Sequence, residues 1–190
     1  MNRDISQHES DARQWFDRWA STSTFQRLNP WLRYVQDQVL DRIDFTSVSR
    51  ILDVACGSGW AVNEAAGRLP DAGLVCGADL SVGMLAQRPS VSHSRARFLA
   101  ASAQRLPFGD GIFDAVICTA AFHHFPMPAA ALIEIRRVLR PGGMLLLTDA
   151  CRDQSVATWV WDRLHRCFEK GHVQYYRTDE LHRLTAEAGF

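Results

Sequence analysis

Two glycines and an aspartate have the types and spacing of a nucleotide-binding site. Gly57 and Gly59 follow the apolar stretch at residues 51–54, and a helical pattern follows them. Glycines at such a turn let a ligand approach the backbone N–H groups and the positive end of the helix. Asp79 lies about twenty residues further on, where a carboxylate can accept from ribose hydroxyls. A nicotinamide cofactor and an adenosyl cofactor fit this pattern equally.

Asp53 and Val62 separate these two cofactors. The dinucleotide fingerprint has a third glycine three residues after the second, and this sequence has Val62 there. Asp53 would repel a pyrophosphate, whereas it would attract the cationic amine and sulfonium of S-adenosylmethionine. The sequence therefore favours the adenosyl cofactor.

The first fifty residues predict two helices ahead of the first strand. The first helix has one apolar face, made by Ala12, Trp15, Phe16 and Trp19. Asn29 and Pro30 are typical of the start of the second helix. The apolar face either belongs to the core or covers the active site. We expect residues 1–49 to cover the site as part of one domain, whose core is residues 50–190.

From residue 50 onward, strand and helix patterns alternate. Strands are predicted at about 50–55, 74–80, 97–101, 113–120 and 144–150. Between them, helices are predicted at about 61–69, 81–87 and 129–140, and two more follow at about 154–170 and 179–188, the last capped by Thr178. Nearly continuous apolar strands that alternate with helices indicate an α/β fold with a parallel sheet covered on both faces.

The pattern Asp53-x-Ala55-x-Gly57-x-Gly59 resembles the first motif of class I S-adenosylmethionine-dependent methyltransferases. Later segments are similar, in order, to the subgroup that includes the ubiquinone and menaquinone biosynthesis enzymes: GADLSVGML, ASAQRLPFGDGIFDAVIC, HHF, EIRRVLRPGGMLLLTD and YYRTDELHRLTAEAGF. The resemblance covers about residues 15–190. It implies a doubly wound, Rossmann-like, mostly parallel sheet in the strand order 3-2-1-4-5.

The resemblance also implies a cofactor, S-adenosylmethionine, with S-adenosylhomocysteine as its product, and a small-molecule methyl acceptor. It assigns the cofactor to Asp53, Ala55, Gly57, Gly59, Asp79, Leu80, Met84, Ser102, Ala103 and Thr119. Asp79 would bind the ribose hydroxyls, Leu80 and Met84 would pack on the adenine, and Thr119 would face the sulfonium.

Ser102 departs from the family pattern. Many relatives have an aspartate there, which accepts a hydrogen bond from the adenine amino group. Serine can accept this bond without the charge that strengthens it. We therefore expect weaker adenine binding, and tighter cofactor binding in Ser102→Asp.

His123 and His124 follow the fourth strand, at the edge of the sheet where ligands bind in such folds. Each is a candidate general base, and the alternative is that they only shape the pocket. We expect no metal site, because adjacent histidines without a third ligand at a helical or turn spacing do not form a tetrahedral cage. Tyr175 and Tyr176 either line the acceptor pocket or pack in the core.

Charge, cysteine spacing and apolar content indicate which partners and which location to expect. The formal net charge is zero, which argues against strong binding to nucleic acid or an anionic membrane. The five cysteines form no Cys-x-x-Cys pair and are expected to be reduced thiols. With no signal peptide or long apolar run, a cytoplasmic protein is expected.

No strand pattern follows the last predicted helix, which is ended by Gly189, and the sequence stops at Phe190. Relatives continue into a strand and its hairpin partner, so the usual final strands are missing and the strand at 144–150 should be an open edge. We expect a homodimer that covers this edge. Two other functions stay open: an S-adenosylmethionine-binding protein without catalytic activity, and a nicotinamide oxidoreductase.

Overall fold

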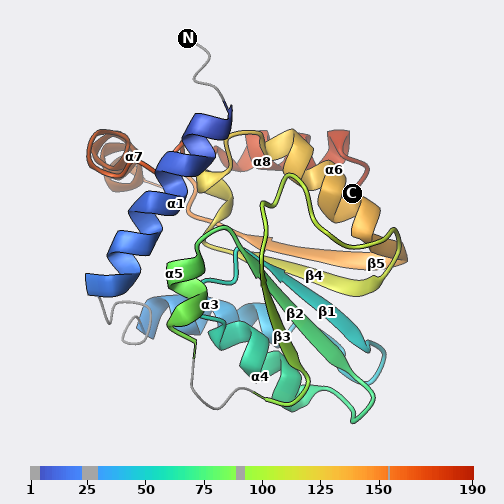
Figure 1. Ribbon diagram of the computed structural model, residues 1–190. Coiled ribbons are helices and arrows are strands. Elements are labelled where there is room, and N and C mark those ends of the chain that lie inside the picture. Colours follow the sequence, from blue (N-terminus) through green and yellow to red (C-terminus); the bar gives the residue numbers. More distant parts are fainter. Residues whose placement is uncertain (1–4, 23–29, 89–92, 154) are drawn as a thin grey trace.

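The protein is described by a computed structural model that covers residues 5–22, 30–88, 93–153 and 155–190 (Figure 1). Its centre is a five-stranded sheet in the order β3-β2-β1-β4-β5, in which every neighbouring pair is parallel. The strands are β1 (Arg50–Val54), β2 (Leu74–Asp79), β3 (Ala96–Ala100), β4 (Phe113–Thr119) and β5 (Leu139–Thr148). The predicted fold class and strand order are confirmed.

Helices cover both faces of this sheet. They are α1 (Ile5–Thr22), α3 (Pro30–Leu40), α4 (Trp60–Arg68), α5 (Val82–Ala86), the 3₁₀ turn η1 (Phe122–His124), α6 (Pro128–Val138), α7 (Val156–Phe168) and α8 (Thr178–Glu187). In Figure 1, α3 and α4 lie on one face and α6 and α8 on the other, while α1 stands beside α5 and α7 at one end of the sheet.

The two faces of β4 supply two hydrophobic cores. Phe113 and Val116 pack with α6, and Ala115 and Ile117 pack with α3 and α4. Every residue of β4 is buried, which is why its sequence is apolar almost without a break. The central strands are therefore fixed from both sides, and their carboxyl ends are rigid supports for a site.

Several predicted boundaries are wrong. The fifth strand, expected from about residue 144, already begins at Leu139. The helix expected to run to residue 140 ends at Val138, because Leu139 is buried and pairs with Phe113 as the first residue of β5. Thr178, the expected cap of the last helix, is its first residue, and Arg177 is the cap. Pro30 does begin α3, whereas Asn29 lies outside the described residues.

Within the described ranges, no strand follows α8, so β5 is an edge of the sheet. Its residue Met144 is 37% exposed. No helix in this part of the chain is long and apolar enough to cross a membrane.

Candidate functional site

A cavity of about 500 Å³ opens at the carboxyl ends of the strands, with α1 as one wall. This volume lies within the usual range for small-molecule sites. Of the residues assigned to the cofactor, those that line it are Ala55, Gly57, Asp79, Leu80, Met84, Ser102, Ala103 and Thr119. Trp15, Phe16 and Trp19 of α1 line it as well, so this apolar face covers the cavity.

The loop after β1 has a constrained backbone. Ala55 and Gly57 have φ angles of 61° and 57°, in the left-handed region. The N–H groups of Ala55 and Cys56 both donate to the carbonyl of Ala78, at 2.7 and 3.1 Å. A left-handed alanine costs about 1–2 kcal/mol, and such strain gathers at ligand sites.

Gly59, which was expected to contact the cofactor, is not among the residues that line the cavity. Its φ is 76°, and a Cβ added to it would collide with the ring of Phe98 on β3. Glycine is therefore needed here for packing of the loop against β3.

Asp79 ties the loop after β1 to the start of α5. Its Oδ2 accepts from the Gly57 N–H at 2.7 Å, and its Oδ1 accepts from the Ser81 N–H at 2.8 Å. Burial raises the pKa of Asp79 to about 6, with a smaller contribution in the same direction from Asp17. The two backbone hydrogen bonds oppose this rise.

Asp53 lies behind the cavity wall instead of in the cavity. It is 1% exposed, and among the described residues neither carboxylate oxygen has a hydrogen-bond partner. Burial, and then the nearby Asp79, raise the pKa of Asp53 well above its usual value. Any attraction to a cationic ligand would act through the loop, without direct contact.

Two acidic residues of α1 hold it over the cavity, and the sequence did not single them out. Glu9 Oε1 accepts from Ser102 Oγ at 2.5 Å and from Gln104 Nε2 at 2.9 Å. Asp17 Oδ1 accepts from Ser81 Oγ at 2.5 Å and from the Gly83 N–H at 2.8 Å. Glu9 is three residues before Ala12 on the apolar face. This spacing was the one feature of the sequence that could have placed Glu9 beside the cavity.

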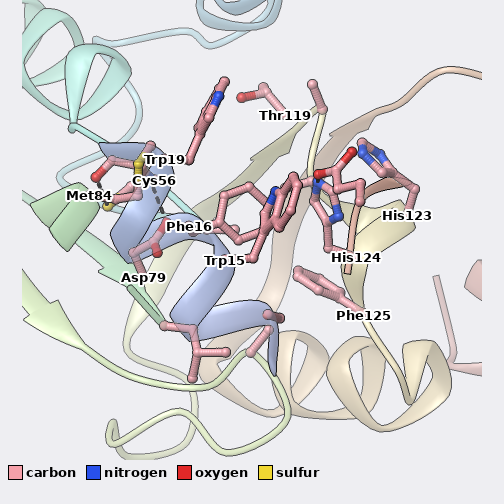
Figure 2. Close-up of a pocket in the computed structure, with 18 of the residues that line it drawn as sticks. Trp15, Phe16, Trp19, Cys56, Asp79, Met84, Thr119, His123, His124 and Phe125 are labelled. Carbon is pink, nitrogen blue, oxygen red and sulfur yellow. Dashed lines mark hydrogen bonds and ion pairs between the residues drawn. The ribbon is translucent and has the colours of Figure 1, made fainter. Parts of the chain in front are cut away.

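The opposite end of the cavity is formed by histidines (Figure 2). In this view Cys56, Asp79 and Met84 lie on one side and His123 and His124 on the other, with side chains of α1 between them. The two ends correspond to the glycine loop after β1 and to η1 after β4.

His123 is held by a carboxylate. Its Nδ1 lies 2.6 Å from Asp149 Oδ1, and its backbone N–H donates to Asp149 Oδ2 at 2.8 Å. Both side chains are almost fully buried, at 9% and 3% exposed. The carboxylate fixes the proton on Nδ1, which leaves Nε2 as the basic atom of a residue that lines the cavity. Asp149 directly follows β5, so its position at a strand end could have identified it as a site residue from the sequence.

His124 has different surroundings. Its Nδ1 lies 3.0 Å from the carbonyl oxygen of Gly171, and its ring packs edge-on against Phe16 with 4.9 Å between ring centroids. Burial, and then His123, lower the pKa of His124 well below its usual value. His124 is therefore a neutral part of the wall.

No third ligand was expected at a helical or turn spacing from these histidines, but the fold brings His172, which is distant in sequence, next to them. The loop after α7 brings His172 back under η1, where the carbonyl of His123 accepts from the N–H of Val173 at 3.0 Å. Burial lowers the pKa of His172 to about 4. Of the two tyrosines, Tyr175 lines the cavity, whereas Tyr176 packs against Phe122 in the core.

Comparisons with known proteins show which family the sequence matches. Residues 52–147 match the family model described as a methyltransferase domain. The chain is 33% identical over 177 residues to malonyl-[acyl-carrier protein] O-methyltransferase from Geobacter sulfurreducens, which covers 82% of this chain and 63% of the relative. It is 39% identical over 122 residues to demethylmenaquinone methyltransferase from Thermus thermophilus, which covers 63% of this chain and 53% of the relative. The chain thus spans about half to two thirds of these relatives' length.

Solved structures share the fold. The YcgJ protein from Bacillus subtilis has a TM-score of 0.74 at 24% identity, over 82% of this chain and 68% of its own. The protein in complex with the Trm112 methyltransferase activator from Haloferax volcanii has a TM-score of 0.80 at 23% identity, over 92% of this chain and 75% of its own. These likenesses show the fold, and the family match together with the sheet order shows that this chain belongs to the methyltransferase domain family, among the class I S-adenosylmethionine-dependent methyltransferases.

Proposed function

We propose that this chain transfers a methyl group from S-adenosylmethionine to a small-molecule acceptor. The observation that carries this proposal is one cavity with two chemically different ends, the glycine loop with Asp79 at one and the Asp149-held His123 at the other. The cofactor supplies an activated methyl carbon with a thioether leaving group. The protein then needs mainly to align the acceptor and exclude water, which can contribute about 7–11 kcal/mol.

The end of the cavity at the glycine loop, which we call the donor end, fits an adenosyl group. Asp79, Leu80 and Met84 all line this end of the cavity, where Asp79 would accept from ribose hydroxyls and the other two would give apolar contact to a base. Glu9, through its bonds to Ser102 and Gln104, brings a carboxylate to the end where the adenine amino group would lie. Thr119 Oγ1 accepts from Gln36 Nε2 at 3.4 Å, and both residues line the cavity.

The end formed by the histidines, which we call the acceptor end, fits a methyl acceptor whose reacting group must lose a proton. His123 Nε2 would take this proton, and Asp149 would stabilise the resulting imidazolium through Nδ1. Trp15 and Phe16 of α1 would shield the reaction from water. We therefore assign the role of general base to His123, and we assign His124 to the wall of the acceptor pocket.

The relatives suggest which acceptors to test first. Their names specify a malonyl thioester on acyl-carrier protein and demethylmenaquinone. The purified chain is incubated with S-adenosylmethionine and each of a panel of malonyl thioesters, demethylated quinones and catechols, and methylated product is measured by mass spectrometry. One methylated acceptor with stoichiometric S-adenosylhomocysteine supports the proposal. Cofactor binding without turnover across a broad acceptor panel would favour the alternative, a binding protein without catalysis.

A homodimer and a cytoplasmic location stay predictions. A second copy would pair along β5, whose outer edge carries backbone groups that no other described strand covers. Light scattering that gives the mass of one chain at micromolar concentration would rule out this dimer.

A further inference from the structure

Three side chains beside the acceptor end play no part in the proposed methyl transfer. His165 lies in the last turn of α7, Glu169 directly follows this helix, and His172 comes after the turn at Gly171. One potential ligand atom from each of His165, Glu169 and His172 lies within 4.8 Å of the other two. Imidazole nitrogens and a carboxylate oxygen form the ligand set of many catalytic zinc sites.

His172 has an arrangement typical of a metal ligand. Its side chain is fully buried, and its Nε2 lies 3.0 Å from Asp162 Oδ1. Its Nδ1 is also buried and has no hydrogen-bond partner within the described part of the chain. Metal-binding histidines usually direct the other ring nitrogen to a carboxylate, which fixes the tautomer and the ring orientation. An unpaired buried acceptor destabilises the folded chain unless something binds it.

Asp162 is itself firmly placed. Its Oδ1 also accepts from the Tyr175 N–H at 2.6 Å, and its Oδ2 accepts from Arg166 at 2.6 Å. The carboxylate that orients His172 is therefore held by α7 and by the backbone of the following loop. The ring of His172 cannot turn without breaking this arrangement.

Glu169 and His165 approach each other without a hydrogen bond. Glu169 Oε2 lies 3.8 Å from His165 Nδ1, and its Oε1 lies 3.8 Å from His124 Nε2. Ligand atoms about 2.0–2.1 Å from a tetrahedral Zn²⁺ are roughly 3.4 Å apart, so shifts of the order of 1 Å would complete the cage. Binding through His165 Nδ1 would displace the Tyr175 hydroxyl, which is 2.9 Å away, whereas binding through Nε2 would leave it in place.

We propose that His165, Glu169 and His172 bind a divalent transition-metal ion of the Zn²⁺ class, with one coordination position open to the cavity. His165 and Glu169 line the cavity and His172 lies behind them, so the open position faces the acceptor end. Metal binding itself does not depend on the proposed methyl transfer. If both proposals hold, the ion would bind an oxygen or sulfur atom of the acceptor beside His123.

A second combination shares one of these ligands. His123, His124 and His172 also offer three atoms within 4.8 Å of one another. We favour the set with Glu169 because a carboxylate brings negative charge to the cation and because its ligands come from one short segment, residues 165–172. This choice also leaves His123 with Asp149, as the proposed base requires.

The test measures metal binding directly. The full chain is freed of metal with a chelator and titrated with Co²⁺, whose visible absorption reports tetrahedral coordination, and with Zn²⁺ in a calorimeter. We expect one ion per chain. Glu169→Gln and His165→Gln should each weaken Zn²⁺ binding at least tenfold, whereas His182→Gln, a matched change at an exposed histidine of α8, should not. His123→Gln should bind Zn²⁺ like the wild type.

Three results would overturn the site: no binding by the wild type, wild-type affinity in both Glu169→Gln and His165→Gln, or loss of binding confined to His123→Gln. Circular dichroism melting of each variant separates loss of a ligand from loss of the fold. S-adenosylhomocysteine titration of the wild type is a separate readout, so failure of the metal proposal and failure of the methyltransferase proposal are distinguishable.

Discussion

Glu9 Oε1 lies 2.5 Å from Ser102 Oγ, although 93 positions separate the two residues in the sequence. The residue at position 102 is not acidic, yet a carboxylate stands beside it because α1 carries one across the cavity. Under the proposed function, the N-terminal helix supplies the negative charge at the adenine end that many relatives place on the strand side.

Glu9→Gln should weaken S-adenosylhomocysteine binding at least about tenfold, because hydrogen bonds to a charged group contribute about 1.5–3 kcal/mol. Calorimetry gives the dissociation constant. Glu64→Gln, the same change at an exposed position of α4, is the matched control and should bind normally. Equal affinity in the two variants would remove Glu9 from the site.

Ser102→Asp should not tighten cofactor binding, contrary to the expectation from sequence. The new carboxylate would stand against Glu9, and two adjacent carboxylates repel each other. In the Glu9→Gln background the repulsion is gone, so Ser102→Asp should then tighten binding. The affinities of the four proteins form a double-mutant cycle, and tighter binding by Ser102→Asp alone would contradict the contact.

Cofactor affinity should fall as the pH falls through about 6, where Asp79 takes up a proton. At pH 5 the ionised fraction is roughly a tenth of its value at pH 8, so affinity should drop roughly tenfold. Because the folded-state pKa is raised, the contribution of Asp79 to stability moves the other way: it is largest below the unfolded pKa, near 3.8, and is lost as the pH rises through about 6. Calorimetry across this range checks the affinity, and Asp79→Asn should bind weakly at every pH.

Gly83→Ala should loosen α1. A Cβ at Gly83 would lie 2.8 Å from the Cα of Asp17, so the helix must shift and its bonds to α5 must lengthen. Overpacking of this kind costs about 1–3 kcal/mol, which predicts a cofactor off-rate raised roughly fivefold or more. Stopped-flow tryptophan fluorescence follows the release through Trp15 and Trp19.

Gly67→Ala on α4 is the control for this variant, because nothing lies within 4 Å of the added Cβ. It should leave the off-rate unchanged and raise stability by about 0.5–1 kcal/mol, since alanine favours the helix. Identical off-rates for Gly83→Ala and Gly67→Ala would show that α1 does not gate release.

His123→Gln and Asp149→Asn should each reduce kcat, by about 100-fold or more for His123→Gln, while changing S-adenosylhomocysteine affinity less than about twofold. His123→Gln removes the base, and Asp149→Asn removes the carboxylate that orients it. Neither change alters the donor end. His124→Gln should have the smaller effect on kcat. If both His123→Gln and Asp149→Asn kept full turnover with an identified acceptor, the general-base assignment would be wrong.

The order of strands and helices could be predicted because apolar strands, glycine turns and helical faces are local signals. The cavity wall was also predictable in large part, since Asp79, Ser102 and Thr119 all follow or end parallel strands, whose carboxyl ends meet at one edge. The position of Asp53 outside the cavity lining could not be predicted, because its motif fixes the position along β1 but not the side of the loop that its carboxylate reaches.

Contacts between distant elements had no such signal. Glu9 and Asp17 reach the site only because α1 packs across the strand ends, and helix docking has no local sequence pattern. His172 joins His123 because the loop after α7 folds back beneath η1. Residues brought in by docking and loop geometry were therefore missed by sequence reasoning, whereas Asp149, which was also missed, follows a strand and could have been found.

The cavity beneath α1 should bind S-adenosylmethionine, and calorimetry of the wild-type chain measures this binding. Titrations with S-adenosylmethionine, S-adenosylhomocysteine and NAD are compared at pH 8, and repeated with Asp79→Asn. We expect one molecule of either adenosyl ligand per chain, weaker binding by the variant, and no heat from NAD. Saturable NAD binding, or no binding of either adenosyl ligand by the folded chain, would contradict it.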